Sequence, residues 1–259
     1  MLQDLFLFVV GIVVGAMNAI AGGGIILGFP ALLACGVSPL MANATSNLVV
    51  LPGSISSIFG YRKYLKRVPK RFLQLTIPCL IGGAIGAITL RYTTANTFEH
   101  YVPVLIVIAV VLFTFQPLLH AQLHTLLKRS STKPIHESLF TLSVAILPMA
   151  IYGGYFGAGF GFMMLAFLGF TSMHDIHRMS AFKNLAGLII ASVSLLCLSG
   201  ADLINWRLGG VMAAGNLIGG YAGARAAQKI SSHTVRVIVI LIGIVTTTYL
   251  LIHTYHHHS

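Results

Sequence analysis

The residues best suited to chemistry in this chain are glycines that interrupt two long apolar runs, over 5–37 and 139–170. These glycines are Gly22, Gly23 and Gly24 in the first run and Gly157, Gly159 and Gly161 in the second. A helix that restarts after such a break presents unpaired backbone N–H groups and the positive end of its dipole. An anion can bind there, because glycine lets a ligand approach the backbone. The alternative is that the glycines serve only the close packing of helices.

A second group of polar side chains follows each broken run. It comprises Asn43, Thr45, Ser46 and Asn47 in the first half of the chain and Ser180, Lys183 and Asn184 in the second. We expect them at the start of membrane helices over 42–60 and 179–199, where they either cap the helix or donate hydrogen bonds to a ligand. Lys183 stands where the first half has Ser46. A cation inside a membrane segment is a candidate functional residue, and the competing interpretation is that its side chain snorkels to the membrane surface.

Carboxylates are absent from the interior of the apolar segments. Carriers of cations generally use intramembrane carboxylates, and acid–base enzymes need positioned titratable groups. His174, Asp175 and His177 could be read as a metal cluster, but they lie in a short connection and are better explained as solvated loop residues. We therefore expect no metal site, no cofactor and no enzymatic activity.

The composition indicates a membrane protein. Of 259 residues, 56% are apolar and 8% are charged, whereas a soluble domain carries about 25% charged residues. Stretches without Asp, Glu, Lys or Arg cover 5–61, 72–90, 100–127, 138–174, 184–201, 208–224 and 237–259. Since a spanning helix needs roughly 20 apolar residues, we expect an all-α polytopic protein with about eight membrane segments.

The net charge of +11 does not indicate nucleic-acid binding, because the basic residues cluster in short loops. Six of them lie between 62 and 71 and three between 128 and 133. Short basic loops are typical of the cytoplasmic side of membrane proteins. Membrane lipid is therefore the expected macromolecular environment, and no nucleic acid is expected as a partner.

An internal duplication organises the chain. The sequence LIGGAIGA at 80–87 matches LIGGYAGA at 217–224 at six of eight positions, and 44–48 falls over 181–185 at the same spacing. We expect a first membrane repeat over 1–119, a polar linker over 120–138 and a second repeat over 139–259. Secondary transporters are often built this way, with the binding site where the repeats meet.

The orientation of the repeats follows from loop charge. The loop at 61–72 is strongly basic, whereas its counterpart near 200–207 holds only Arg207 beside Asp202. The bias reverses in the next pair of loops, which favours inverted over parallel repeats. Inversion requires an odd number of crossings in each half, and a glycine-broken first run that re-enters would supply it. Non-helical backbone at that depth is tolerated where it lines a cavity.

The sequence resembles the sulfite exporter TauE/SafE family of membrane permeases over essentially its whole length. The segments that carry the resemblance are 15–24 (GAMNAIAGGG), 30–32 (PAL), 36–39 (GVSP), 42–48 (ANATSNL), 53–56 (GSIS), 154–159 (GYFGAG) and 183–185 (KNL). The resemblance implies a bacterial inner-membrane carrier of sulfur-containing anions such as sulfite or organosulfonates. Asn18 departs from the family pattern, because many relatives have an acidic residue there, and this departure puts proton coupling in doubt.

Together these observations predict a carrier with alternating access and a central anion site between two related halves. The expected contacts are Gly22, Gly23, Gly24, Asn43, Thr45, Ser46, Asn47, Gly159, Gly161, Lys183 and Asn184. The expected partner is a small anionic substrate, and a homodimer is a possible assembly. The alternatives are an intramembrane enzyme and an assembly subunit of another membrane complex.

Overall fold

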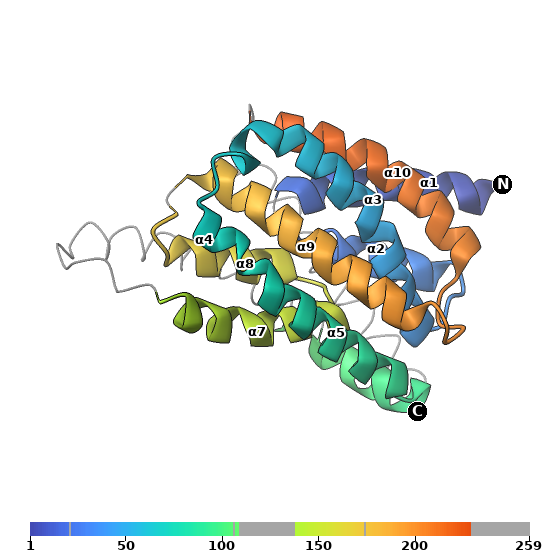
Figure 1. Ribbon diagram of the computed structural model, residues 1–259. Coiled ribbons are helices and arrows are strands. Elements are labelled where there is room, and N and C mark those ends of the chain that lie inside the picture. Colours follow the sequence, from blue (N-terminus) through green and yellow to red (C-terminus); the bar gives the residue numbers. More distant parts are fainter. Residues whose placement is uncertain (21, 106, 109–137, 174, 229–259) are drawn as a thin grey trace.

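A computed structural model describes residues 1–20, 22–105, 107–108, 138–173 and 175–228. Every element of these residues is helical (Figure 1). The helices include α1 (Leu2–Ile20), α2 (Ile25–Ala34), α3 (Pro39–Leu65), α4 (Lys70–Leu73), α5 (Thr76–Tyr92), α7 (Leu139–Tyr155), α8 (Phe160–Gly169), α9 (Ile176–Leu198) and α10 (Trp206–Ala226). The expected linker over 120–138, apart from residue 138, and the expected helix over 235–252 lie outside the described residues, as does most of the expected helix over 101–119.

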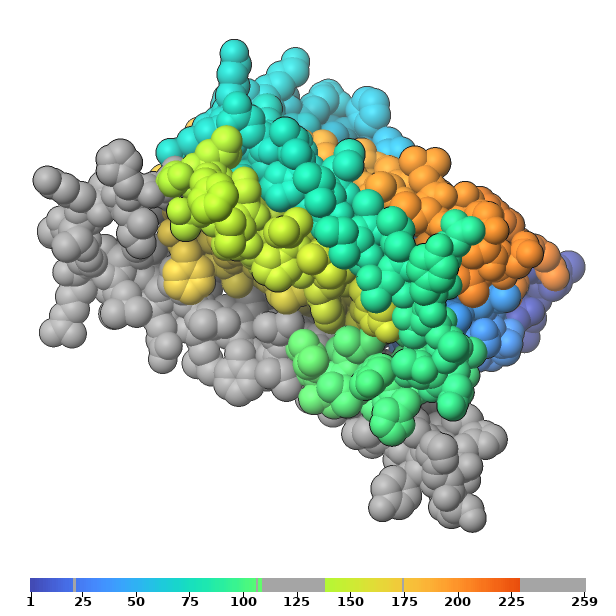
Figure 2. Space-filling model, turned by 60° about the horizontal axis from the view of Figure 1, so that its bottom comes forward, coloured from blue at the N-terminus to red at the C-terminus, as the bar shows by residue number. Residues whose placement is uncertain are grey.

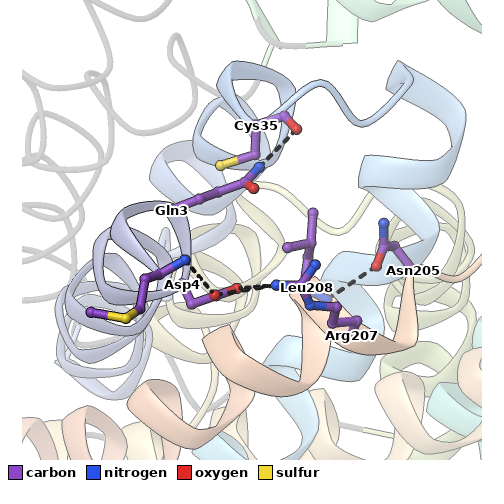
Figure 3. A network of polar contacts seen from close by, with 7 residues as sticks. Gln3, Asp4, Cys35, Asn205, Arg207 and Leu208 are labelled. Carbon is purple, nitrogen blue, oxygen red and sulfur yellow. Dashed lines mark hydrogen bonds and ion pairs between the residues drawn. The ribbon is translucent and has the colours of Figure 1, made fainter.

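The first apolar run folds as a helical hairpin. α1 ends at Ile20, and Gly22 adopts a φ of +93°, a conformation that costs glycine little. The chain then reverses, and α2 returns along α1 until the Gln3 side chain donates a hydrogen bond to the Cys35 carbonyl at 3.0 Å (Figure 3). This first hairpin therefore enters and leaves the molecule at the same end.

The second apolar run folds as a second hairpin. α7 ends at Tyr155, and Gly157 and Gly159 have φ values of +74° and +83°. The Tyr152 hydroxyl closes the turn by donating to the Ala158 carbonyl at 2.7 Å. α8 then returns beside α7. The interruptions that the glycines predicted are confirmed in both runs.

The long helices run in two opposed directions. α1, α3 and α10 run one way, and α5, α7 and α9 run the other, so that α3 and α9 cross the centre antiparallel (Figure 1). The contacts that fix these directions are Asp4–Arg207, Thr45–Asn205, Gly60–Gln228, Tyr64–His177, Phe72–Phe182 and Arg91–Cys197. The hairpins consequently enter from opposite ends of the molecule.

Glycines bring the hairpins against helices from the other part of the chain. A methyl group on Gly219 would lie 1.9 Å from the Ile12 carbonyl oxygen of α1, and one on Gly86 would lie 2.1 Å from the Ile151 carbonyl oxygen of α7. Figure 2 shows α5 and α7 side by side along one face. The small-residue spacing thus serves close backbone approach between helices, as the sequence predicted.

The outward faces of the helices suit a membrane. Three described stretches are long and apolar enough to cross a bilayer: Leu2–Ile20, Lys70–Tyr92 and Ile176–Leu198. Large apolar side chains such as Phe6, Ile81 and Leu196 are exposed on them. Lipid would cover these side chains, which makes the protein a membrane protein.

Charged side chains gather at the two ends of the helices. The basic end carries Arg62, Lys63, Lys66, Arg67, Lys70, Arg71, Arg178 and Arg225. The opposite end carries the N-terminus and the side chains of Asp4, Arg91, Glu99, Asp202 and Arg207. Asp4 pairs there with Arg207 at 3.1 Å (Figure 3). One end of the helices is therefore strongly basic, and the other end carries charges of both signs.

The helix starts expected before Asn43 and Ser180 are wrong. α3 begins earlier, at Pro39, and α9 begins at Ile176, where Asp175 accepts a hydrogen bond from the His177 amide at 2.9 Å. A proline at the first helical position and an Asp cap are ordinary start signals. The polar cluster therefore lies inside the two central helices, and its side chains are available for contacts between helices.

Candidate functional site

The tips of the two hairpins meet in the middle of the molecule. A methyl group on Gly161 would lie 2.4 Å from Gly22 Cα, and one on Gly22 would lie 2.4 Å from Gly161 Cα. No other residue type fits at this contact, because any Cβ would overlap the opposing backbone. The crossing of the two tips thus explains both glycines without a ligand.

A small cavity of about 40 Å³ lies beside this crossing. Its walls come from both hairpins and from the antiparallel pair α3 and α9. The lining residues are Asn18, Gly22, Ile25, Asn47, Val50, Ser54, Gly153, Gly157, Phe160, Gly161, Lys183, Asn184, Gly187, Ile190 and Ala191. At about 10–15 Å³ for each water centre, the cavity has room for about three waters or for one small oxyanion.

Lys183 is the titratable side chain of this site among the described lining residues. It is 2% exposed, so its side chain does not snorkel to the surface. Its Nζ donates to the carbonyl oxygens of Asn18 at 2.7 Å and Ala19 at 3.2 Å, in the last turn of α1. These carbonyls are at the negative end of the helix dipole, which a cation stabilises. Asn184 adds a longer hydrogen bond to Ala19 O at 3.4 Å.

Asn43 makes the corresponding contact at the other tip. It lies on α3, and its Nδ2 donates to the carbonyl oxygen of Tyr155, the last residue of α7, at 2.7 Å. Each central helix thus caps the end of the hairpin helix from the other part of the chain. The α1 end receives the amino group of Lys183 and an amide, whereas the α7 end receives one amide.

Two helix N-termini also border the cavity. Ile25 is the first residue of α2, and Phe160 and Gly161 are the first two residues of α8. The first backbone N–H groups of a helix have no partner within it, and its dipole makes that end positive. With Lys183 nearby, the cavity wall is electropositive and suits an anion.

Five of the eleven residues predicted for the site line the cavity: Gly22, Asn47, Gly161, Lys183 and Asn184. The other six, Gly23, Gly24, Asn43, Thr45, Ser46 and Gly159, have packing or capping contacts instead. A methyl group on Gly23 would meet the Phe162 ring at 2.3 Å, and Ser46 donates to Ala42 O at 2.9 Å within its own helix. Thr45 Oγ1 accepts a hydrogen bond from the Asn205 amide at 3.0 Å.

Asn18, Ser54 and Gly187 also line the cavity, although the sequence prediction does not include them. Ser54 is 1% exposed, and its Oγ has no hydrogen-bond partner among the described residues. The helical period was the available signal, because Asn47 and Ser54 are two turns apart and share a face of α3. Gly187 similarly lies one turn beyond Lys183 on α9.

The fold and the cavity define an all-helical membrane protein with a small electropositive site between two hairpin tips. The comparisons with known proteins give the family. The chain matches the sulfite exporter TauE/SafE family over residues 7–250 and belongs to it. The resemblance seen in the sequence is thereby confirmed.

The relatives match this chain over most of their own length. A protein of Haemophilus influenzae called "Probable membrane transporter protein" is 29% identical over 93% of this chain and 91% of its own length. The Escherichia coli K12 protein "Probable membrane transporter protein YfcA" is 28% identical over 95% of this chain and 88% of its own. No solved structure matches the chain. The protein is thus a member of a family of membrane transporters.

Proposed function

We propose that this transporter moves a small anion, sulfite or an organosulfonate, across the bacterial inner membrane. The observation that carries the proposal is the convergence of Lys183 and the N-termini of α2 and α8 on one cavity. An anion that loses its hydration shell needs several donors in its place. Lys183, Asn47, Asn184 and the Ser54 hydroxyl are the side chains that would supply them. The name of the family supports sulfite as the first substrate to test.

Transport suits this cavity better than catalysis. Lys183 is the one titratable side chain among the described lining residues, and the lining has no carboxylate or imidazole. A hydrolytic or acid–base mechanism would use at least one further positioned proton donor or acceptor. A site between two hairpins that enter from opposite ends is, by contrast, what a carrier that opens to each side in turn needs.

The helix directions support inverted repeats over 1–119 and 139–259. α1 packs on α10 as α7 packs on α5, and α3 packs on α10 as α9 packs on α5. Each matched pair runs in opposite directions. One re-entrant hairpin and three spans in each half would account for about eight membrane segments. The linker would then lie between the two repeats. Alternating access then follows from rocking of one repeat against the other.

The orientation follows from the charged ends. The basic end should face the cytoplasm, so that the N-terminus lies outside. A single cysteine at Lys66 should be labelled by an impermeant reagent only in inside-out vesicles, and one at Gln3 only in right-side-out vesicles. Labelling of Gln3→Cys from the cytoplasmic side alone would contradict this orientation.

Counterflow in proteoliposomes tests the proposal directly. Vesicles loaded with unlabelled sulfite should accumulate labelled sulfite transiently, because a carrier exchanges external for internal substrate. Sulfate, thiosulfate, methanesulfonate and acetate should be tested as competitors to define the class of anion. The absence of exchange for every one of these anions, with protein that elutes as a single folded species, would rule the proposed function out.

A further inference from the structure

The charge of Lys183 has no counter-ion in the described structure. Its two partners are neutral carbonyl oxygens, and no Asp or Glu among the described residues lies near it. Asp4 of α1 is at the opposite end, paired with Arg207, and Asp175 of α9 caps its own helix and pairs with Arg178. A buried unpaired ammonium is strongly disfavoured in a membrane interior.

The other titratable side chains on the helices packed against α9 do not supply a negative charge either. These side chains are Tyr61 and Tyr64 on α3, Cys79 and Tyr92 on α5, Tyr152 and Tyr155 on α7, and His177 and Cys197 on α9 itself. The basic residues of α3 and α5 lie near the helix ends, and α8 has no titratable side chain. Phenols and thiols are neutral near pH 7. An anion in the cavity is therefore the natural counter-ion for Lys183.

The hydrogen bonds of Lys183 fit a neutral amine as well as an ammonium. A neutral amine has two N–H donors and one lone pair, and Nζ has two acceptors, Asn18 O and Ala19 O. Lys183 also lines the cavity, so the lone pair of its neutral amine is the position on Nζ that stays open to the cavity. A proton can be added there without breaking either hydrogen bond to α1.

We propose that Lys183 is the proton carrier of this transporter, neutral when the cavity is empty and protonated when an anion occupies it. This inference rests on the proposed anion transport. On the open side, the Nζ lone pair binds a proton from water as the anion enters, and the two charges compensate each other. On the other side, the anion leaves, the ammonium loses its counter-ion, and Nζ returns the proton to water. One proton thus moves with each anion.

This role also accounts for what the sequence lacks. Proton-coupled carriers commonly bind the proton on an intramembrane carboxylate. Here the hairpin tip has Asn18, and the described lining has no carboxylate. A lysine can replace such an acid because it also exchanges one proton, and its protonated form attracts the transported anion directly.

Proton uptake on anion binding is the primary test. Methanesulfonate and sulfate are suitable probes, because neither changes its charge near neutral pH. Calorimetric titrations at pH 7.5 in two buffers of different ionisation enthalpy should give close to one proton taken up for each anion bound by the wild type. The Lys183→Arg variant keeps a permanent charge, so it should bind anion with no proton uptake. No uptake by the wild type, or unchanged uptake by Lys183→Arg, would overturn the proposal.

A second measurement needs no anion and so separates this inference from the proposed function. Without anion the folded chain holds Lys183 neutral, whereas the unfolded chain exposes a lysine that is protonated below about pH 10. Unfolding then takes up a proton, and the unfolding temperature of the wild type should rise from pH 7 to pH 9 more than that of Lys183→Met. Equal slopes for the two proteins would contradict a neutral lysine, even if anion exchange is observed. Loss of anion exchange with unequal slopes would contradict the proposed function alone.

Discussion

The two hairpin tips are built alike but held differently. At the first tip, Lys183 and Asn184 of α9 bond to the carbonyls at the end of α1; at the second, Asn43 of α3 bonds to the carbonyl of Tyr155 at the end of α7. Both contacts satisfy helix-end carbonyls that would otherwise be buried without partners. The difference lies in the capacity for charge, since the first tip has an amino group that can bind a proton and the second has an amide that stays neutral.

The two hairpin tips differ in what capping a helix end requires and in what an anion site would add. Capping a buried helix end requires a donor, and an amide suffices for that at Tyr155. Placing a lysine at the other tip adds a group that can carry a charge, which capping does not require and which is costly to bury without a counter-ion. We infer that the first tip carries the selectivity for anions, while the second tip serves mainly to hold its hairpin in place.

The largest effect is expected where the tips touch. Gly161→Ala should abolish anion exchange and strongly reduce the yield of folded protein, because the new methyl group would lie 2.4 Å from Gly22 Cα. The opposing backbone cannot move away from such a contact unless the two hairpins separate. Exchange in proteoliposomes and size-exclusion profiles in detergent would measure both losses.

Gly22→Ala and Gly36→Ala form a matched pair for this prediction. Both glycines have positive φ, +93° and +81°, but Gly36 has nothing within 4 Å of an added methyl group. A strained φ costs about 1–3 kcal/mol at either position, so only Gly22→Ala should also lose exchange. Equal exchange by the two variants would show that the tip contact is not essential.

The next effect concerns the charge at the first tip. Lys183→Ala should weaken anion binding by about 1.5–3 kcal/mol, the range for a hydrogen bond to a charged group. That corresponds to roughly a ten- to hundredfold increase in Kd. Isothermal calorimetry with sulfite in one detergent is the measurement.

Asn43→Ala is the control variant for Lys183→Ala. It removes the cap of α7 and should cost about 1–3 kcal/mol of stability through the unsatisfied Tyr155 carbonyl. Its anion affinity should stay within about threefold of the wild type, because Asn43 does not line the cavity. If Lys183→Ala binds sulfite as tightly as the wild type does, the lysine is only a cap like Asn43.

The smallest effect is expected from two serines on α3. Ser54 lines the cavity and its Oγ has no partner among the described residues, whereas Ser57 donates to Gly53 O at 2.7 Å and to Gly220 O at 3.2 Å. Ser54→Ala should raise the Kd for the anion about two- to tenfold with little loss of stability, as expected for one neutral hydrogen bond.

Ser57→Ala should do the reverse and lower stability by about 1 kcal/mol while leaving the affinity unchanged. Thermal unfolding and anion titration of the two variants side by side would decide between these outcomes. A stability loss in Ser54→Ala equal to that in Ser57→Ala would place the Ser54 hydroxyl in packing, not in anion binding.

Much of the fold could be predicted because it depends on local features of the sequence. The apolar runs, the positive-φ glycines of the breaks and the small-residue spacing of 82–86 and 219–223 each have a direct structural consequence. The two central helices begin earlier than the polar residues suggest, because Ser38-Pro39 and Asp175 are the start signals that act there. The eight membrane segments stay a prediction.

The site was less predictable because it depends on contacts between distant residues. Lys183, Asn47 and Gly161 stood out by residue type, but their meeting depends on the crossing of two hairpins from separate parts of the chain. Nor could the sequence reveal that Gly23 faces the Phe162 ring while Gly22 faces backbone. The difference depends on the direction that each glycine faces within its turn. Neighbouring glycines in a sequence give no sign of that direction.

Locating the bound anion tests the central claim most directly. Crystals of the protein grown with selenate, an analogue of sulfur oxyanions, would show selenium by its anomalous scattering. We expect one strong peak between the hairpin tips, with an oxygen of the anion about 2.7–2.9 Å from Lys183 Nζ. Peaks confined to the basic end, around Arg62 to Arg71, with none in the cavity beside Gly22 and Gly161, would contradict it.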